Sequence, residues 1–133
     1  MLTLENMMTA TLKTIRPDAT VQEAARRMRD ERVGSLLVER DGQIVAIVTE
    51  TDIVRKAAAQ GVDLGKEKIE GVMSAPVASI AMHRNPQDAH DMMGDLGVRH
   101  LGVTDKRKIV GLISVRDLLV YFKSVSEPRI TQD

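Results

Sequence analysis

The sequence contains no cysteine and no tryptophan, and Tyr121 and Phe122 are its only Tyr and Phe residues. Without cysteine, neither a disulfide framework nor a thiolate metal site can form, and we expect a reducing, cytoplasmic location. Without a row of aromatic side chains, single-stranded bases have no platform on which to stack. The core must therefore be built from Val, Ile, Leu, Ala and Met.

An excess of one charge is also missing, because 19 Lys and Arg residues balance 19 Asp and Glu residues. Nucleic-acid binding is therefore not favoured, since it needs a positive excess that displaces counterions, and we interpret the basic residues 106–108 as a solvated hairpin loop. The longest apolar run, residues 44–48, is far too short to cross a bilayer. Residues 1–6 lack the basic and apolar segments of a signal peptide, so we expect no membrane association.

The chain carries an internal repeat. When the sequence is shifted by 65 positions, it aligns with itself without a gap from Met8 to Leu119, and Asp52 falls on Asp117. A period this long indicates two copies of one supersecondary unit, which we expect to share one core and to form two equivalent clefts. The expected boundaries are repeat 1 at residues 8–62, a linker at 63–72, repeat 2 at 73–123 and a loose tail at 124–133.

Each copy has the pattern of strand, helix, strand, strand and helix, which predicts an α+β (mixed α/β) fold of two β-α-β-β-α repeats related by a pseudo-two-fold axis. Thr20 and Glu23 have the spacing of a capping box, and Asn85-Pro86 is typical of a helix start. Asp41-Gly42 predicts a hairpin turn. The expected strands are residues 12–15, 35–38, 44–48, 100–103 and 109–113, and the expected helices begin at Thr20, Thr49 (ending at Gly61), Asn85 and Ser114.

The most informative motif lies where the third strand of each copy meets its second helix. A hydroxyl residue is followed three positions later by aspartate: Thr49 and Asp52 in copy one, Ser114 and Asp117 in copy two. A helix N-cap with an acidic partner explains this spacing by itself. The same geometry also suits a nucleotide, because a helix N-terminus attracts phosphate and an aspartate can accept hydrogen bonds from a ribose diol. The two interpretations are compatible.

An ordered set of motifs, present in both copies, resembles a known family. Val33-Gly34-Ser35 precedes Thr49-Glu50-Thr51-Asp52 in copy one, and Val98-Arg99-His100 precedes Ser114-Val115-Arg116-Asp117 in copy two. Each copy is similar to a CBS domain, and together they resemble a stand-alone bacterial-type tandem CBS pair, or Bateman module. The resemblance covers residues 8–121.

The resemblance implies a regulatory, signal-transducing sensor that forms a homodimer, acts on an unidentified protein and has no obligatory cofactor. It implies that adenosine-containing ligands (AMP, ADP, ATP, NAD or S-adenosylmethionine) bind in clefts between the repeats, with AMP, ADP or ATP the expected ligand. It assigns Ser114, Arg116 and Asp117 together with Thr14, Val33, Gly34 and Ser35 to one cleft, and Thr49 and Asp52 together with Ser79, Val98, Arg99 and His100 to the other.

Departures from the family pattern make the two clefts unequal. Thr51 occupies a position where similar sequences often have arginine, as at Arg116, and Ala46 a position where glycine is usual, as at Gly111. Gly102 stands where proline often follows. Because Thr51 removes a phosphate contact, we expect the cleft with Asp117 to bind better than the cleft with Asp52.

Catalysis and metal binding are not indicated. The chain has no Gly-x-Gly-x-x-Gly motif, no phosphate-binding loop with Gly-Lys-Ser/Thr and no cysteine nucleophile, so we do not expect an enzyme. The histidines, His83, His90 and His100, are scattered, which does not favour a metal site.

The alternative function is a protein–protein interaction or dimerisation module in which one or both clefts no longer bind ligand. We expect the last helix to expose Leu118, Leu119, Tyr121 and Phe122, an apolar surface that a homodimer would cover.

Overall fold

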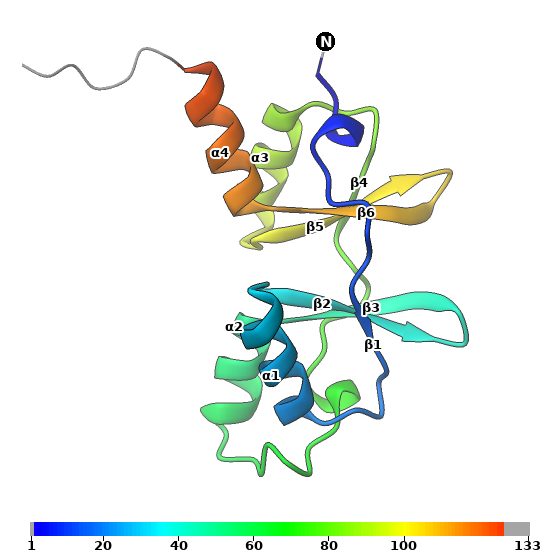
Figure 1. Ribbon diagram of the computed structural model, residues 1–133, viewed down its shortest axis with the longest axis vertical. Coiled ribbons are helices and arrows are strands. Elements are labelled where there is room, and N and C mark those ends of the chain that lie inside the picture. Colours follow the sequence, from blue (N-terminus) through cyan, green and yellow to red (C-terminus); the bar gives the residue numbers. More distant parts are fainter. Residues whose placement is uncertain (1, 127–133) are drawn as a thin grey trace, which may run out of the picture. The chain divides into compact units, whose positions relative to one another are not determined.

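The computed structural model describes residues 2–126 and divides into two compact units (Figure 1). Unit 1 is formed by Met1–Thr11 and Ala78–Asp133, and unit 2 by Leu12–Val77. Of the tail expected at residues 124–133, the last helix takes in residues as far as Val125, and residues 127–133 lie outside the described part of the chain.

Each unit has a three-stranded sheet in which the first strand is parallel to the second and the second antiparallel to the third. The predicted mixed α/β fold of two equivalent repeats is thereby confirmed. The elements of unit 2 are β1 (Thr14–Ile15), α1 (Val21–Glu31), β2 (Ser35–Arg40), β3 (Gln43–Thr49), α2 (Glu50–Asp52), the π-helical η2 (Ile53–Ala58) and the 3-10 helix η3 (Ile69–Gly71). Those of unit 1 are the 3-10 helix η1 (Leu4–Asn6), β4 (Ser79–Ala81), α3 (Pro86–Leu96), β5 (His100–Asp105), β6 (Lys108–Ser114) and α4 (Val115–Val125).

The helix starts follow the predicted caps. The Asn85 side chain accepts a hydrogen bond from the Asp88 N–H at 2.8 Å, and Pro86 is the first residue of α3. Thr20 accepts from the Glu23 N–H at 3.1 Å, but the return bond from Glu23 is not formed, so the capping box predicted there is only half present. The expected helix from Thr49 to Gly61 begins as predicted but turns π-helical after Asp52 and ends at Ala58.

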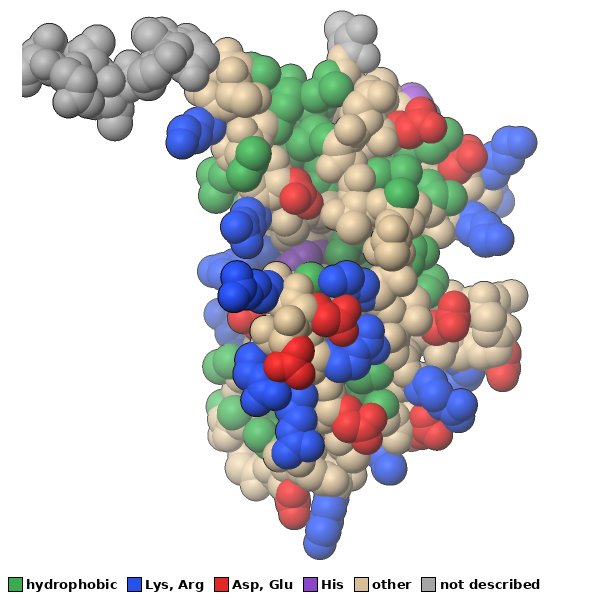
Figure 2. Space-filling view, viewed as in Figure 1, with side chains coloured by type: hydrophobic (Ala, Val, Ile, Leu, Met, Phe, Trp, Pro, Cys, Tyr) green, Lys and Arg blue, Asp and Glu red, His purple; other side chains and the backbone are tan. Residues whose placement is uncertain are grey.

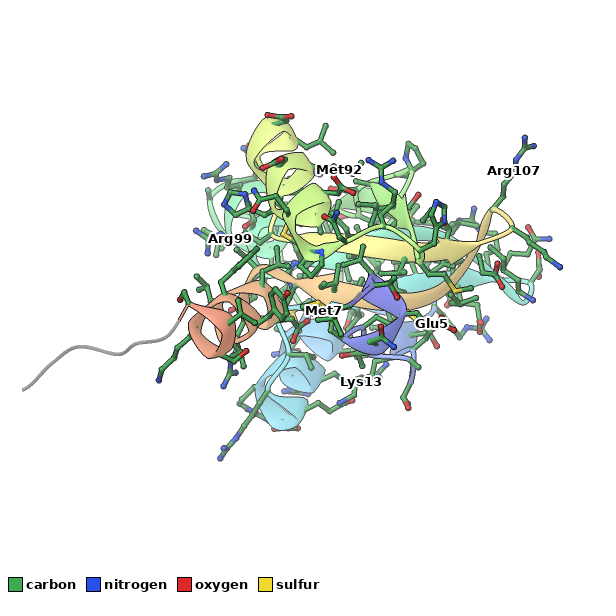
Figure 3. The ribbon with its side chains drawn as sticks, turned by 90° about the horizontal axis from the view of Figure 1, so that it is seen from above. Glu5, Met7, Lys13, Met92, Arg99 and Arg107 are labelled. Carbon is green, nitrogen blue, oxygen red and sulfur yellow. The ribbon has the colours of Figure 1, made fainter. Side chains whose placement is uncertain are left out.

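Both hairpin turns use residues with positive φ, which matches the twist of the strands they join. Asp41 and Gly42 have φ of 53° and 79°, as their sequence predicts. The equivalent Lys106 and Arg107 have φ of 51° and 68° although neither is glycine. Arg107 points away from the protein at the tip of the β5–β6 hairpin (Figure 3), in agreement with the interpretation of residues 106–108 as a solvated loop.

Most of the buried hydrophobic residues form two clusters, one in each unit. Leu37 and Ile47 are buried outside both clusters, and the shared core that we expected stays a prediction. The segment that precedes each repeat packs into the unit built from the other repeat. Leu4 is fully buried in unit 1, where its N–H donates to the Arg84 carbonyl at 2.9 Å. Ile69, 65 positions later, is fully buried in unit 2 and donates to the Ala19 carbonyl at 2.8 Å. Each core is therefore completed by a segment that is distant in sequence from the residues to which it is hydrogen-bonded.

No helix within residues 2–126 is both long enough and apolar enough to span a membrane.

Candidate functional site

The Ser114 turn (residues 114–117) joins β6 to α4 and is held by a complete capping box. The N–H and the hydroxyl of Ser114 donate to Asp117 Oδ2 at 2.8 and 3.0 Å, and the Asp117 N–H donates to Ser114 Oγ at 3.2 Å. Asp117 Oδ2 accepts the first two of these bonds, and the Ser114 hydroxyl oxygen accepts the third. The interpretation of this motif as a helix cap is therefore correct, and it leaves Asp117 Oδ1 outside the cap.

Within unit 1, no described group bonds Asp117 Oδ1, and the residue is only half-buried. Arg116 is exposed and makes no hydrogen bond or ion pair to another described residue of unit 1. The turn thus presents a carboxylate oxygen and a guanidinium group at the N-terminus of an 11-residue helix. These groups can accept hydrogen bonds from a diol and attract a phosphate, respectively.

The Thr49 turn (residues 49–52) has the same cap but different surroundings. The N–H and the hydroxyl of Thr49 donate to Asp52 Oδ2 at 3.0 and 3.2 Å. Asp52 Oδ1 accepts a hydrogen bond from Ser74 Oγ at 2.8 Å and lies 3.0 Å from Lys56 Nζ. The Asp52 side chain is only 7% exposed, so both of its oxygens are occupied within unit 2. We call these residues (Asp52, Lys56 and Ser74) the Asp52 cluster.

Sequence reasoning missed this cluster. Lys56 follows Asp52 by four positions, a spacing that allows an ion pair on a helix and could have been noticed. Ser74 carried no such signal, because it approaches Asp52 only through the bridge between Ser74 and Ile47, which adds its segment to the edge of β3.

The strands bring further predicted residues beside each turn. Ser35 is paired with Thr49 across β2 and β3, and the Gly34 carbonyl accepts from the Glu50 N–H at 3.0 Å. In unit 1, His100 is paired with Ser114, and the Arg99 carbonyl accepts from the Val115 N–H at 2.8 Å. Val33 and Val98 directly precede these residues.

Thr14 and Ser79 lie on the first strand of their units, beside Leu37 of β2 and Gly102 of β5. The Thr14 carbonyl accepts a hydrogen bond from the Arg27 guanidinium. The assignment of each ligand site to residues of both repeats stays a prediction.

Packing explains why Gly111 and Ala46 differ. A Cβ added at Gly111 would lie 2.3 Å from Sδ and 2.8 Å from Cγ of Met8, which covers this strand position in unit 1. Ala46 at the equivalent position of unit 2 is fully buried with its Cβ in place. A side chain at position 111 would therefore require Met8 to move.

The described histidines do not gather into a metal site, and residues 2–126 contain no group of three His, Asp or Glu side chains that could hold one. His90 lies beside Asp91 on α3 at 3.0 Å from its carboxylate. Its hydrogen bond, with a second from Gln87, lowers the pKa of Asp91. This is an exposed pair on a helix surface.

The apolar surface of α4 differs from the expected one. Leu118 is 2% exposed and Phe122 packs against the unit 1 core, because both lie on the helix face that covers the sheet. Leu119 is exposed as expected, at 66%, and the other exposed apolar residues of α4 are Val115, Val120 and Val125, at 38%, 63% and 56%. Tyr121 and Phe122 are half-buried. Figure 2 shows hydrophobic side chains at the surface over α3 and α4.

Comparison with known proteins identifies the repeats. The model of the CBS domain matches residues 4–59 and 69–124. The CBS domain-containing protein YhcV of Bacillus subtilis is 32% identical over 120 residues, which cover 90% of this chain and 85% of that protein. An uncharacterised protein of Acidianus ambivalens is 33% identical over 83% of this chain, which spans 66% of that protein.

Solved structures share the fold. A CBS-domain protein from Burkholderia ambifaria superposes with a TM-score of 0.90 at 27% identity, covering 98% of this chain and all of that one. The CBS domain pair of the protein MJ0100, solved with 5′-methylthioadenosine and S-adenosyl-L-methionine, has a TM-score of 0.82 at 22% identity, over 92% of this chain and 97% of that one. With two family matches that begin at Leu4 and Ile69, this chain belongs to the CBS-domain family and carries two CBS domains.

Proposed function

We propose that this protein is a regulatory module that binds an adenosine-containing ligand at the Ser114 turn. The observation that carries the proposal is the Asp117 carboxylate, which caps α4 with one oxygen and keeps the other outside the cap. That oxygen accepts the ribose hydroxyls, and Arg116 pairs with a phosphate or carboxylate of the ligand. AMP, ADP or ATP is the expected ligand, and no obligatory cofactor and no catalysis are proposed.

MJ0100, whose CBS pair was solved with two adenosine derivatives, shares the fold of this chain. At 22% identity that likeness concerns the fold, so the ligand of this chain is inferred from the groups at the turn. In such a module the ligand changes a partner protein by binding two conformations with different affinity.

A thermal-shift titration with AMP, ADP, ATP, NAD and S-adenosylmethionine tests the proposal. A ligand at about 100 times its Kd stabilises the folded state by about 2.7 kcal/mol, which raises the melting temperature by several degrees. We expect Asp117→Asn to abolish the shift, because the amide oxygen can still cap α4 while an NH2 group replaces the second acceptor.

Asp88→Asn is the matched control, since Asp88 holds the same position in the capping box of α3. Arg116→Ala should weaken ATP binding more than adenosine binding. Unchanged ligand shifts in Asp117→Asn would contradict the proposal.

A second candidate function, self-association, is favoured by the exposed apolar residues of α4. Hexameric CBS-CP12 protein from bloom-forming cyanobacteria, 30% identical with a TM-score of 0.83 over 97% of this chain and 77% of that one, is an oligomeric relative. Leu119→Glu should then shift sedimentation velocity profiles towards the monomer. A wild-type protein that sediments as a monomer at all concentrations would exclude this function.

A further inference from the structure

The two turns are alike in their caps and differ in what meets the second carboxylate oxygen. In the Asp52 cluster, the Ser74 hydroxyl donates to Asp52 Oδ1 at 2.8 Å and accepts from Lys56 Nζ at 3.1 Å. Lys56 Nζ also lies 3.0 Å from the same carboxylate oxygen. The three groups therefore satisfy one another, and no acceptor on the Asp52 carboxylate is left for a diol.

The repeat explains why the Ser114 turn is different. A shift of 65 positions places Lys56 on Tyr121 and Ser74 on Thr9. Thr9 makes the same backbone bridge, to Leu112, that Ser74 makes to Ile47. The hydroxyl is thus retained, but Tyr121 supplies no charge and packs edge to face against Phe122. Two differences therefore separate the turns: unit 2 has Lys56 where unit 1 has Tyr121, and the Ser74 hydroxyl bonds Asp52, whereas the structure shows no such bond from Thr9 to Asp117.

We propose that Lys56 and Ser74 exclude ligand from Asp52, so that this chain binds one adenosine ligand, at the Ser114 turn, and Asp52 serves as a structural tie for the Ser74 segment. The exclusion of ligand rests on the proposed function, which supplies the ligand. The structural role of Asp52 rests only on the geometry of unit 2. A ligand at Asp52 must break a charge-assisted hydrogen bond and an ion pair to a nearly buried carboxylate, which weakens its affinity at least about tenfold relative to an open turn.

The tie is tested without any ligand by comparing two matched substitutions in urea unfolding. Asp52→Asn removes the charge that Lys56 and Ser74 bind, whereas Asp117→Asn removes a charge that, among the described residues of unit 1, only Ser114 of its own helix cap binds. We expect Asp52→Asn to raise the unfolding equilibrium constant at least about tenfold more than Asp117→Asn. Equal effects of the two substitutions would overturn the tie.

The binding part is tested by calorimetric titration with AMP and, separately, with ATP. Wild-type protein should bind one equivalent per chain. Thr51→Arg combined with Lys56→Tyr gives unit 2 the equivalents of Arg116 and Tyr121 and should add a second equivalent. Tyr121→Lys should weaken the first equivalent at least about tenfold, whereas Tyr121→Phe should leave it unchanged. Circular dichroism melts establish that each variant folds.

The outcomes separate this inference from the proposed function. Two equivalents of equal affinity in the wild type, or one equivalent in the Thr51→Arg, Lys56→Tyr variant, would overturn the exclusion while leaving nucleotide binding intact. Binding of none of AMP, ADP, ATP, NAD and S-adenosylmethionine to the wild type would remove the proposed function and with it the exclusion. The unfolding comparison would then decide the structural role of Asp52 alone.

Discussion

Leu4 provides a direct test of how the chain is divided between the two units. It precedes residues 8–62, the expected first repeat, yet its side chain is fully buried in the core of unit 1, where the other buried residues of the cluster come from residues 80–118. Leu4→Ala removes three buried carbon atoms while the backbone bond to the Arg84 carbonyl remains. Truncation of a fully buried leucine costs about 2–5 kcal/mol, because apolar contacts are lost and a cavity remains.

The comparison is with Leu2→Ala, since Leu2 is 36% exposed and lies on the same segment. A partly exposed surface substitution changes stability by about 0.5 kcal/mol or less. In urea unfolding followed by far-UV circular dichroism, Leu4→Ala should therefore lower the transition midpoint clearly and Leu2→Ala barely.

Amide hydrogen exchange shows where the loss occurs. Leu4→Ala should accelerate exchange in β5 and β6 first, because these strands pack against Leu4. Equal midpoints for Leu4→Ala and Leu2→Ala, or faster exchange confined to β2 and β3, would refute the assignment of this segment to unit 1.

Three further substitutions test local features of α1 and α3. Arg32 ends α1 with φ of 56°, and the equivalent residue of α3, Gly97, has φ of 67°. Because glycine adopts positive φ more readily than arginine, Arg32→Gly should raise the free energy of unfolding by about 1 kcal/mol in chemical unfolding, and Gly97→Arg should lower it. The pKa of Glu31 is lowered by hydrogen bonds from Arg27 and then Lys13, so its contribution to stability is present above the ordinary carboxyl pKa and is lost as the pH falls through the lowered value. Glu31→Gln should therefore be slightly less stable than wild type at neutral pH and equally stable in acid, and a deficit that persists in acid would show that charge is not its cause.

Local features of the fold could be predicted from the sequence because the groups that determine them are close along the chain. The Asn85-Pro86 helix start and the Asp41-Gly42 turn depend on contacts within four residues. The caps at Thr49 and Ser114 were predicted for the same reason.

Features that depend on distant contacts could not be predicted. Leu4 and Ile69 lie in short segments that show no helical or strand periodicity. Only their packing shows that each of them completes a core. Leu118 was expected at the surface, because helical spacing alone does not show which face of α4 meets the sheet. The hydrogen bond between Ser74 and Asp52 spans 22 positions and had no counterpart in any local pattern.

The Thr/Ser-x-x-Asp motif therefore carries less functional information than its repetition suggests. A capping box uses one carboxylate oxygen, so every copy of the motif leaves a second oxygen for another partner. In unit 2 that partner is a pair of the protein's own side chains, and in unit 1 the described residues supply none. Because the cap is the same in both, the proposed exclusion makes the residue four positions after the aspartate, Lys56 or Tyr121, the one to compare between a structural carboxylate and a proposed ligand-binding one. In other tandem repeats of this type, a lysine at that position should accompany loss of binding at that turn, which ligand stoichiometry can measure.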